Sequence, residues 1–150
     1  MSYKDLLVVL DSAPDTQGRV TLAAALAERF VAHLVGLFPM PSIELPRRAG
    51  YPDLAVLEPI YREWRERALA QAEELRQAFE HAARLRGLSN EWRAVDEGWE
   101  ADPALHARYA DLAILGQRDP DSDEMAMIRP RPERVTLASG RPILVVPYAG

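Results

Sequence analysis

Short apolar runs alternate with longer amphipathic stretches along the whole chain. Four runs are aliphatic and end at Asp, Pro or Gly: 6–10, 34–38, 110–115 and 143–146. Runs of this length and composition predict strands that are buried on both faces of a parallel sheet. A fifth run, at 91–96, is more polar. It predicts a strand at an edge of the same sheet.

Two helices are predicted in the first half of the chain from apolar residues at helical spacing. The first follows Asp15, which is suited to be its N-cap, and carries a stripe over 20–31. The second is long and is predicted to begin near Pro59, which suits a first turn, and to end at Gly87 as its C′ residue. Two i,i+4 ion pairs are expected on its outer face: Glu63 with Arg67, and Glu80 with Arg84.

Two shorter helices are predicted nearer the C-terminus. One begins at Pro103 with Asp102 as its cap, and the other runs over 132–139 and ends at Gly140. The resulting order, β-α-β-α-β-α-β-α-β, predicts a parallel sheet with helices on both faces and right-handed crossovers. The whole chain, 1–150, is expected to form one domain.

Composition narrows the classes of function. The chain has no Cys, which excludes disulfides, thiol catalysis and metals held by thiolates. Its net charge of −5 argues against a general nucleic-acid binder. No apolar stretch approaches the roughly 20 residues of a membrane span, and the N-terminus lacks the long apolar region of a signal peptide. We therefore expect a soluble, cytoplasmic protein.

Familiar catalytic and metal-binding motifs are absent from the sequence. The histidines show no zinc-ligand spacing, and the chain contains no P-loop, no Gly-x-Gly-x-x-Gly and no Gly-x-Ser-x-Gly. Asp119-x-Asp121-x-Asp123 has the opening spacing of a calcium loop, but Glu124 and Pro130 occupy positions that need Gly and Glu. No catalytic residue and no metal ligand is therefore assigned.

The stretch after Gly116 is where a ligand is expected, because ligands of open parallel sheets bind past the carboxyl ends of the strands. Phosphate binding there needs backbone N–H groups that point at the anion. Pro130 and Pro132 have no N–H, and four acidic side chains between 119 and 124 add negative charge. The arginines at 118, 129 and 131 offset this charge in part.

Several segments in order resemble the universal stress protein family over nearly the full length. They are the first strand ending in Asp11, Ala27-Glu28-Arg29-Phe30, the run 110–116, Glu133-Arg134-Val135, and the closing run 141–147. The resemblance implies a three-layer α/β sandwich with a five-stranded parallel sheet of order 3-2-1-4-5. It also implies a homodimer formed through the last strand.

The resemblance is to the branch of that family with a degenerate ATP-binding motif. ATP-binding members carry Gly-x-x-Gly, about nine residues, then Gly-Ser or Gly-Thr. Gly116 matches the first Gly, but Asp119 stands at the second and Arg129-Pro130 at the closing pair. Relatives also tend to have Gly where this chain has Val31. A β-branched residue disfavours positive φ, so we expect the first helix to end differently.

Three functions follow as hypotheses. The first is a non-enzymatic stress-response domain without bound ATP, which acts through a protein partner or through dimerisation by its last strand, Ile143, Leu144, Val145 and Val146. The second is an adenine-nucleotide switch that binds ATP or AMP through a non-standard set: Asp11, Gly116, Arg118, Arg129 and Arg131. The third is a nucleotide hydrolase, for which no base–nucleophile pair is visible.

Two questions stay open at this level. Asp11 is either a ligand-binding residue at the end of the first strand or a residue that organises the turn after it. Tandem family members continue into a second copy after the last strand, so this chain is alternatively one half of such a protein. The Pro-rich stretch 39–52 has no assigned role.

Overall fold

The computed structural model describes residues 2–40, 54–95, 101–117 and 131–148, except for the side chains of 54–57. Helices and strands alternate strictly within these ranges, as predicted. In chain order they are β1 (Asp5–Val9), α1 (Thr16–Phe30), β2 (His33–Pro39), α2 (Leu54–Leu85), β3 (Asn90–Val95), α3 (Pro103–Ala107), β4 (Leu112–Gly116), α4 (Pro132–Ser139) and β5 (Ile143–Val146).

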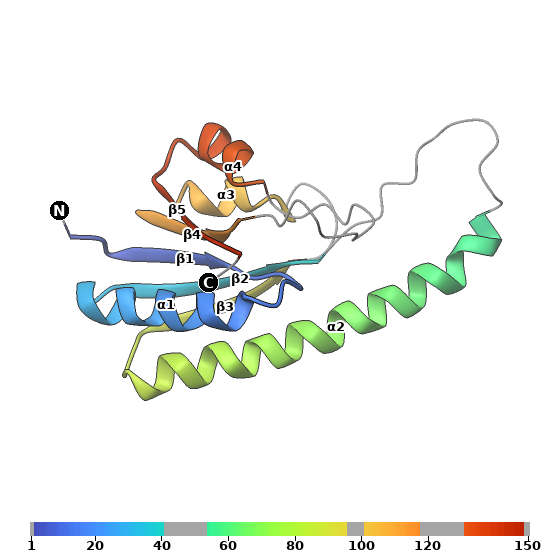
Figure 1. Ribbon diagram of the computed structural model, residues 1–150, viewed down its shortest axis with the longest axis horizontal. Coiled ribbons are helices and arrows are strands. Elements are labelled where there is room, and N and C mark those ends of the chain that lie inside the picture. The colour runs from blue at the N-terminus through green and yellow to red at the C-terminus, as the bar shows by residue number, and fades with distance from the viewer. Residues whose placement is uncertain (1, 41–53, 96–100, 118–130, 149–150) are drawn as a thin grey trace.

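The five strands form one parallel sheet in the order β3-β2-β1-β4-β5, which confirms the predicted fold class. The polar strand β3 lies at one edge, as expected, and β5 lies at the other. Figure 1 shows α1 and α2 on one face of the sheet and α3 and α4 on the other, so the chain forms three layers. In the described part of the chain, no helix is both long and apolar enough to cross a membrane.

Strand β1 and Leu10, which follows it, show why the central runs are apolar at every position. Leu6, Val8 and Leu10 face α1 and α2, whereas Leu7 and Val9 face α3 and α4. All five are at most 1% exposed. Burying each such side chain contributes about 1.5–3 kcal/mol, so both faces of the sheet stabilise the fold. A strand with one solvated face would have alternated with polar residues.

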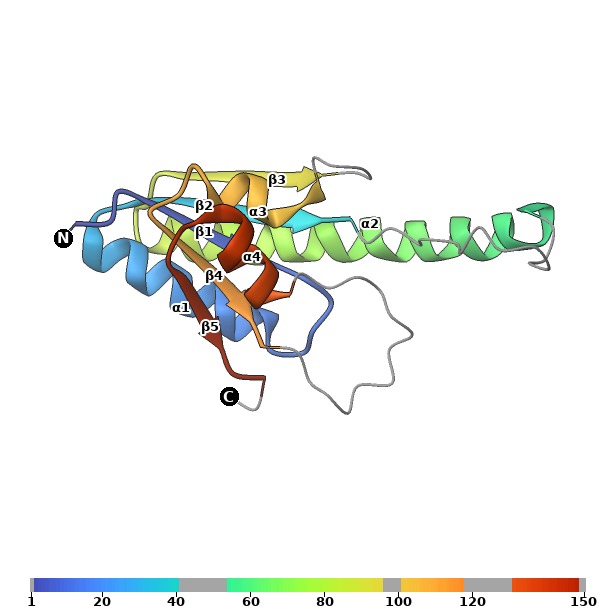
Figure 2. The ribbon, with the colours of Figure 1, turned by 90° about the horizontal axis from the view of Figure 1, so that it is seen from above.

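Helix α2 is longer than predicted. It begins at Leu54, and Pro59 lies inside it rather than in its first turn. A proline removes only one N–H bond, and here it falls in the second turn, close to the helix start. At about 1.5 Å per residue the helix spans roughly 48 Å. Figures 1 and 2 show that its N-terminal half extends beyond the sheet.

One of the two expected ion pairs on α2 forms. Arg67 pairs with Glu63, as predicted. The predicted ion pair between Glu80 and Arg84 does not form, because Glu80 binds Arg76 on the preceding turn. Arg84 contacts His81 instead, at 3.2 Å.

Left-handed residues end three of the helices. Gly87 (φ 63°) and Gly140 (φ 66°) follow α2 and α4, as predicted. Val31 after α1 is also left-handed (φ 53°), so the expectation that this helix ends differently is wrong. The N–H of buried Ala32 donates to the carbonyl oxygen of Ala27, and that of His33 donates to the carbonyl oxygen of Lys4, just before β1. These bonds hold Val31 in a conformation that its own side chain disfavours.

Asp111 lies just before β4, at the edge of the sheet where the parallel strands begin, and its carboxylate binds the start of β1. Its Oδ2 accepts hydrogen bonds from the backbone N–H groups of Lys4 (2.7 Å) and Asp5 (3.1 Å). These two donors hold the pKa of the Asp111 carboxyl below its usual range. Strand β4 begins at Leu112, so residues 110 and 111, which were predicted to belong to it, lie before it. Asp102 caps α3 as expected, through the N–H of Ala104 at 3.0 Å.

Candidate functional site

The candidate site lies at the carboxyl edge of the sheet between β1 and β4. The chain leaves β1 for β2 on one side and later returns as β4 on the other, which makes this position the topological switch point of the sheet. The turn 10–15 follows β1, and Gly116 ends β4. Both Asp11 and Gly116 lie against the same side chain here, that of Arg19.

Arg19 is in the first turn of α1 and is only 1% exposed despite its charge. Its Nη1 donates to the carbonyl oxygen of Val9 at 2.8 Å and lies 3.3 Å from Oδ2 of Asp11. Its Nη2 lies 3.0 Å from Oδ2 of Asp15. The planar guanidinium thus joins the last residue of β1 to two carboxylates of the following turn.

The carboxylate of Asp11 is occupied on both oxygens. Oδ1 accepts from the N–H of Ala13 at 3.0 Å and from the hydroxyl of buried Thr16 at 2.9 Å, while Oδ2 faces Arg19. These contacts organise the turn after β1, which is one of the two roles considered for Asp11. A ligand that used this carboxylate would have to displace them.

Asp15 occupies the N-cap position of α1, but its side chain makes no capping hydrogen bond. The predicted N-cap position is therefore confirmed, but the side-chain hydrogen bond expected of an N-cap does not form. The carboxylate instead binds Arg19, one helical turn further along. A buried guanidinium requires anionic partners more strongly than a helix start requires a cap, because an unpaired buried charge is far more costly.

The charge of this cluster is unfavourable to an anion. One guanidinium faces two carboxylates, which leaves a formal charge of −1, and the carboxylate side chains are only 15% and 14% exposed. A phosphate about 4 Å from either carboxylate would be repelled by about 1 kcal/mol in water and about 4 kcal/mol at an effective dielectric constant of 20. Nε of Arg19 is buried without a hydrogen-bond partner.

Gly116 has a structural reason to be glycine. A Cβ at this position would lie 2.0 Å from Nη2 and 2.5 Å from Cζ of Arg19. Because Arg19 is held by Val9, Asp11 and Asp15, its guanidinium cannot move aside without losing those contacts. The glycine that matches the first position of a phosphate-binding motif therefore makes room here for an arginine of the same chain.

Of the three arginines proposed as nucleotide ligands, only Arg131 belongs to the described residues. Arg118 and Arg129 lie outside those residues, as does the acidic stretch 119–124. Arg131 is the exposed N-cap residue of α4 and makes no side-chain capping bond. Within the described ranges, no contact links Arg131 to Asp11 or Gly116.

The sequence interpretation missed Arg19, although two signals were present. Arg19 falls on the buried stripe of α1 with Thr16, Val20 and Ala23, where an arginine is out of place unless it is paired. It also follows Asp15 at i,i+4 spacing, which favours an ion pair. Its contacts with Val9 and Gly116 had no such signal, because they depend on how strands meet in space.

The histidines are dispersed in the structure. His33 Nδ1 lies 2.8 Å from Ser89 Oγ, and His81 contacts Arg84. His106 lies 3.4 Å from Arg93 on β3. Across the four described ranges, no group of three or more His, Asp or Glu side chains is placed to hold a metal ion.

No protein-family model and no curated protein sequence matches this chain. Solved structures do match it over nearly its whole length. The universal stress protein UspA from Lactobacillus plantarum is 20% identical, with 97% of this chain and 99% of that chain covered and a TM-score of 0.71. A protein of the universal stress protein family from Burkholderia pseudomallei is 21% identical, with 97% and 96% covered and a TM-score of 0.59.

A universal stress protein in complex with cAMP is also similar, at 19% identity, with 97% of this chain and 98% of that chain covered and a TM-score of 0.58. At these identities the likeness shows the fold and not the function. The chain therefore has the fold of the universal stress proteins over nearly its whole length. The fold that the motifs implied is confirmed.

Proposed function

We propose that this protein is a universal stress protein that acts through association with a second copy or another protein, and does not bind ATP in the manner of nucleotide-binding members. The observation that carries the proposal is Arg19. Its guanidinium lies against Gly116 and binds Asp11 at the switch point, where the fold class places ligands. The chain itself supplies the occupant of that position.

The surface proposed for self-association is the outer edge of β5. This strand is last in the sheet order and pairs with β4 on its inner side. Ile143, Leu144 and Val146 are half-buried, and Val145 is 41% exposed. An exposed apolar edge strand tends to pair with another strand, and a second copy satisfies it with two-fold symmetry.

The test for nucleotide uses purified protein. The protein is denatured and the supernatant is chromatographed for adenine nucleotide, and native protein is titrated by calorimetry with MgATP, AMP and cAMP. We expect no released nucleotide and no saturable heat. Co-purified nucleotide, or binding in the micromolar range, would overturn this half of the proposal.

The test for association is sedimentation equilibrium over a range of concentrations. Val145→Glu places two like charges across the two-fold, which costs several kcal/mol, so the dimer constant should weaken at least about tenfold. Leu137→Glu on α4 is the matched control, because Leu137 is 87% exposed and lies off the strand edge. Wild-type protein that stays monomeric, or equal effects of both substitutions, would contradict dimerisation through β5.

The second candidate is an adenine-nucleotide switch. It is supported by the structural likeness to a universal stress protein in complex with cAMP. This candidate requires Arg19 to leave Asp11 when the nucleotide binds. Saturable binding in the titration above that is lost on Arg131→Gln would favour it over the first. Three further statements stay predictions: that the protein is not an enzyme, that it is cytoplasmic, and that the chain is one half of a tandem protein.

A further inference from the structure

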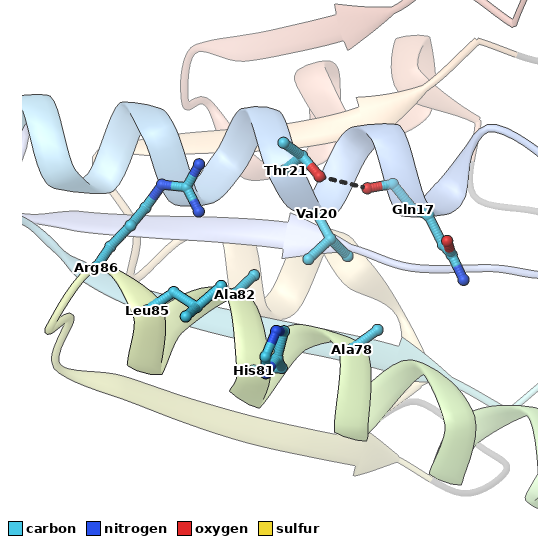
Figure 3. A pocket seen from close by; sticks show the side chains of 8 residues that line it. All are labelled: Gln17, Val20, Thr21, Ala78, His81, Ala82, Leu85 and Arg86. Carbon is cyan, nitrogen blue, oxygen red and sulfur yellow. Dashed lines mark hydrogen bonds between the residues drawn. The ribbon is translucent and has the colours of Figure 1, made fainter.

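A groove between α1 and α2 lies apart from the residues of the proposed function. The two helices run side by side on one face of the sheet (Figure 1). An open pocket of about 230 Å³ lies between them (Figure 3). We call it the α1/α2 groove. It is lined by residues of α1 near Val20, by the last two turns of α2, and by Arg86 just beyond them.

The floor of the groove is apolar and is open because its side chains are small. Val20 is buried at its base, and Ala78 and Ala82 of α2 present only methyl groups to it. Leu85 forms one end and is 69% exposed. An exposed leucine beside an unfilled apolar hollow is a surface that an apolar ligand group would cover.

The rim is polar, and its lining includes a cation but no carboxylate. Gln17, Thr21, His81 and Arg86 line it. Figure 3 shows the guanidinium of Arg86 extending from the end of α2 toward α1. Its Nε lies 3.4 Å from Glu28, a long contact to a carboxylate that is itself 59% exposed. Among the described residues its terminal nitrogens have no partner, so they remain available as donors.

The charge around the groove favours an anion. Arg84 lies 3.2 Å from His81 and adds a second cation beside the lining. Among the lining residues Arg86 is the only Lys or Arg and no carboxylate is present, because Glu28, which pairs with Arg86, lies outside the lining. The charge of the lining is therefore opposite in sign to that of the Arg19 cluster, although both lie along α1. An anionic head at the Arg86 end therefore gains attraction that a neutral or cationic head would lack.

We propose that the α1/α2 groove binds a small amphipathic carboxylate. The carboxylate accepts hydrogen bonds from the terminal nitrogens of Arg86, and the apolar chain lies along Leu85, Ala82 and Val20. At about 30 Å³ for a water-sized group, the cavity holds about eight such groups, which fits a chain of roughly six to eight carbons.

Sodium octanoate is the probe for this site. Its dissociation constant is measured by calorimetry, and the residues affected are located by NMR shift perturbation. Arg86→Gln should weaken octanoate about tenfold, the value of a charge-assisted hydrogen bond. Arg62→Gln is the matched control, because Arg62 is an arginine of α2 that pairs with Glu58 and does not line the groove. Octanol, with the same chain and no charge, should bind wild-type protein about tenfold more weakly.

A second pair of variants tests the apolar floor. Ala82→Leu fills the groove from α2 and Thr21→Met fills it from α1, and each should abolish saturable binding while the thermal transition is retained. The proposal is overturned if octanoate does not saturate at millimolar concentration, if octanol binds equally well, or if filling the groove leaves binding unchanged. Because neither variant touches Asp11, Gly116 or β5, these results are independent of the proposed function.

Discussion

Helix α1 lies between two candidate ligand sites, one of which is filled by a side chain of the protein and the other of which is open. At the switch point, Arg19 reaches from α1 toward β4 and is 1% exposed, so its guanidinium occupies the space beside Gly116. On the outer side, Ala78 and Ala82 of α2 face α1 and leave about 230 Å³ unfilled. The first lies at the switch point of the sheet, where ligands of this fold class bind, yet the second is the one that stays open, because its alanine side chains are small.

The two sites also differ in how their polar groups are satisfied. The two terminal nitrogens of Arg19 bind Val9, Asp11 and Asp15 of the same chain, while its buried Nε has no hydrogen-bond partner among the described residues. Arg86 at the groove has one long contact with Glu28. A ligand at the switch point would have to replace several internal hydrogen bonds, whereas one at the groove would replace mainly water. The position of a hollow in a fold is therefore weaker evidence for binding than the state of its polar groups.

The largest effect is expected from removing the occupant of the switch point. Arg19→Met keeps most of the buried aliphatic volume but leaves the carboxylates of Asp11 and Asp15 without their cation. Breaking a buried pair in this way costs about 3 kcal/mol of unfolding free energy. Urea denaturation measures it.

The control for that prediction is a double-mutant cycle. Arg19→Met combined with Asp15→Asn should lose less than the sum of the single losses, because the two side chains contact each other. Additive losses, or a loss below about 1 kcal/mol for Arg19→Met alone, would mean that the cluster contributes little to stability.

A smaller loss of stability is expected from Gly116→Ala, which adds a methyl group to the space that Arg19 already fills. The added Cβ would meet Nη2 of Arg19 at 2.0 Å, and overpacking of this kind costs about 1–3 kcal/mol. Gly18→Ala is the contrasting variant, since a Cβ there meets nothing within 4 Å. In a helix it should stabilise the protein by about 0.5–1 kcal/mol. Losses of similar size from both substitutions, measured by thermal unfolding, would contradict this reading of Gly116.

The third prediction concerns the far end of α1, where the backbone rather than a side chain is under strain. Val31→Gly should stabilise the protein by about 1 kcal/mol, because Val31 has φ 53° and is 91% exposed, so little packing is lost. Gly87→Ala at the end of α2, with φ 63°, should destabilise it by a similar amount. A destabilised Val31→Gly protein would show that the side chain contributes more than its strain costs.

The smallest effect is expected at Asp111, which lies just before β4 and differs from Asp11 in its partners. Asp11 binds a guanidinium at the carboxyl edge of the sheet, whereas Asp111 binds backbone N–H groups at the amino edge. The amides of Lys4 and Asp5 lower the pKa of Asp111 below 3.8. The Asp111 carboxylate therefore stabilises the folded protein fully above pH 3.8, and this stabilisation is lost as the pH falls through the folded-state pKa. The stability difference between wild type and Asp111→Asn should therefore shrink below pH 3.8. A difference that is unchanged by acid would exclude this role.

Much of the fold was readable from the chain, and the errors have local causes. The apolar runs and the alternation of strands and helices predicted every described element, and the resemblance to a family supplied the strand order. The Glu80–Arg84 pair was wrong because Arg76 competes for the same carboxylate. The ending of α1 was wrong because the backbone bonds after Val31 override the preference of its side chain.

The candidate site was only half readable. Asp11 and Gly116 were identified from their positions at strand ends, and the structure places both against Arg19. Arg19 was missed, because arginine is ordinarily solvated and its place on the apolar stripe of α1 makes sense only once its partners are known. Those partners come from β1, the turn after it and β4.

The sequence by itself determined the elements, because hydrophobic periodicity acts over neighbouring residues and requires no knowledge of the fold. It also determined that the first phosphate-motif glycine is present without the others. Only the tertiary structure decided what that glycine accommodates. The end of β4 and the start of α1 are distant along the chain, and hydrogen bonds and excluded volume act between atoms that are close in space. Whether the hollow beside Gly116 holds a ligand or the chain's own arginine therefore depended on the folded arrangement.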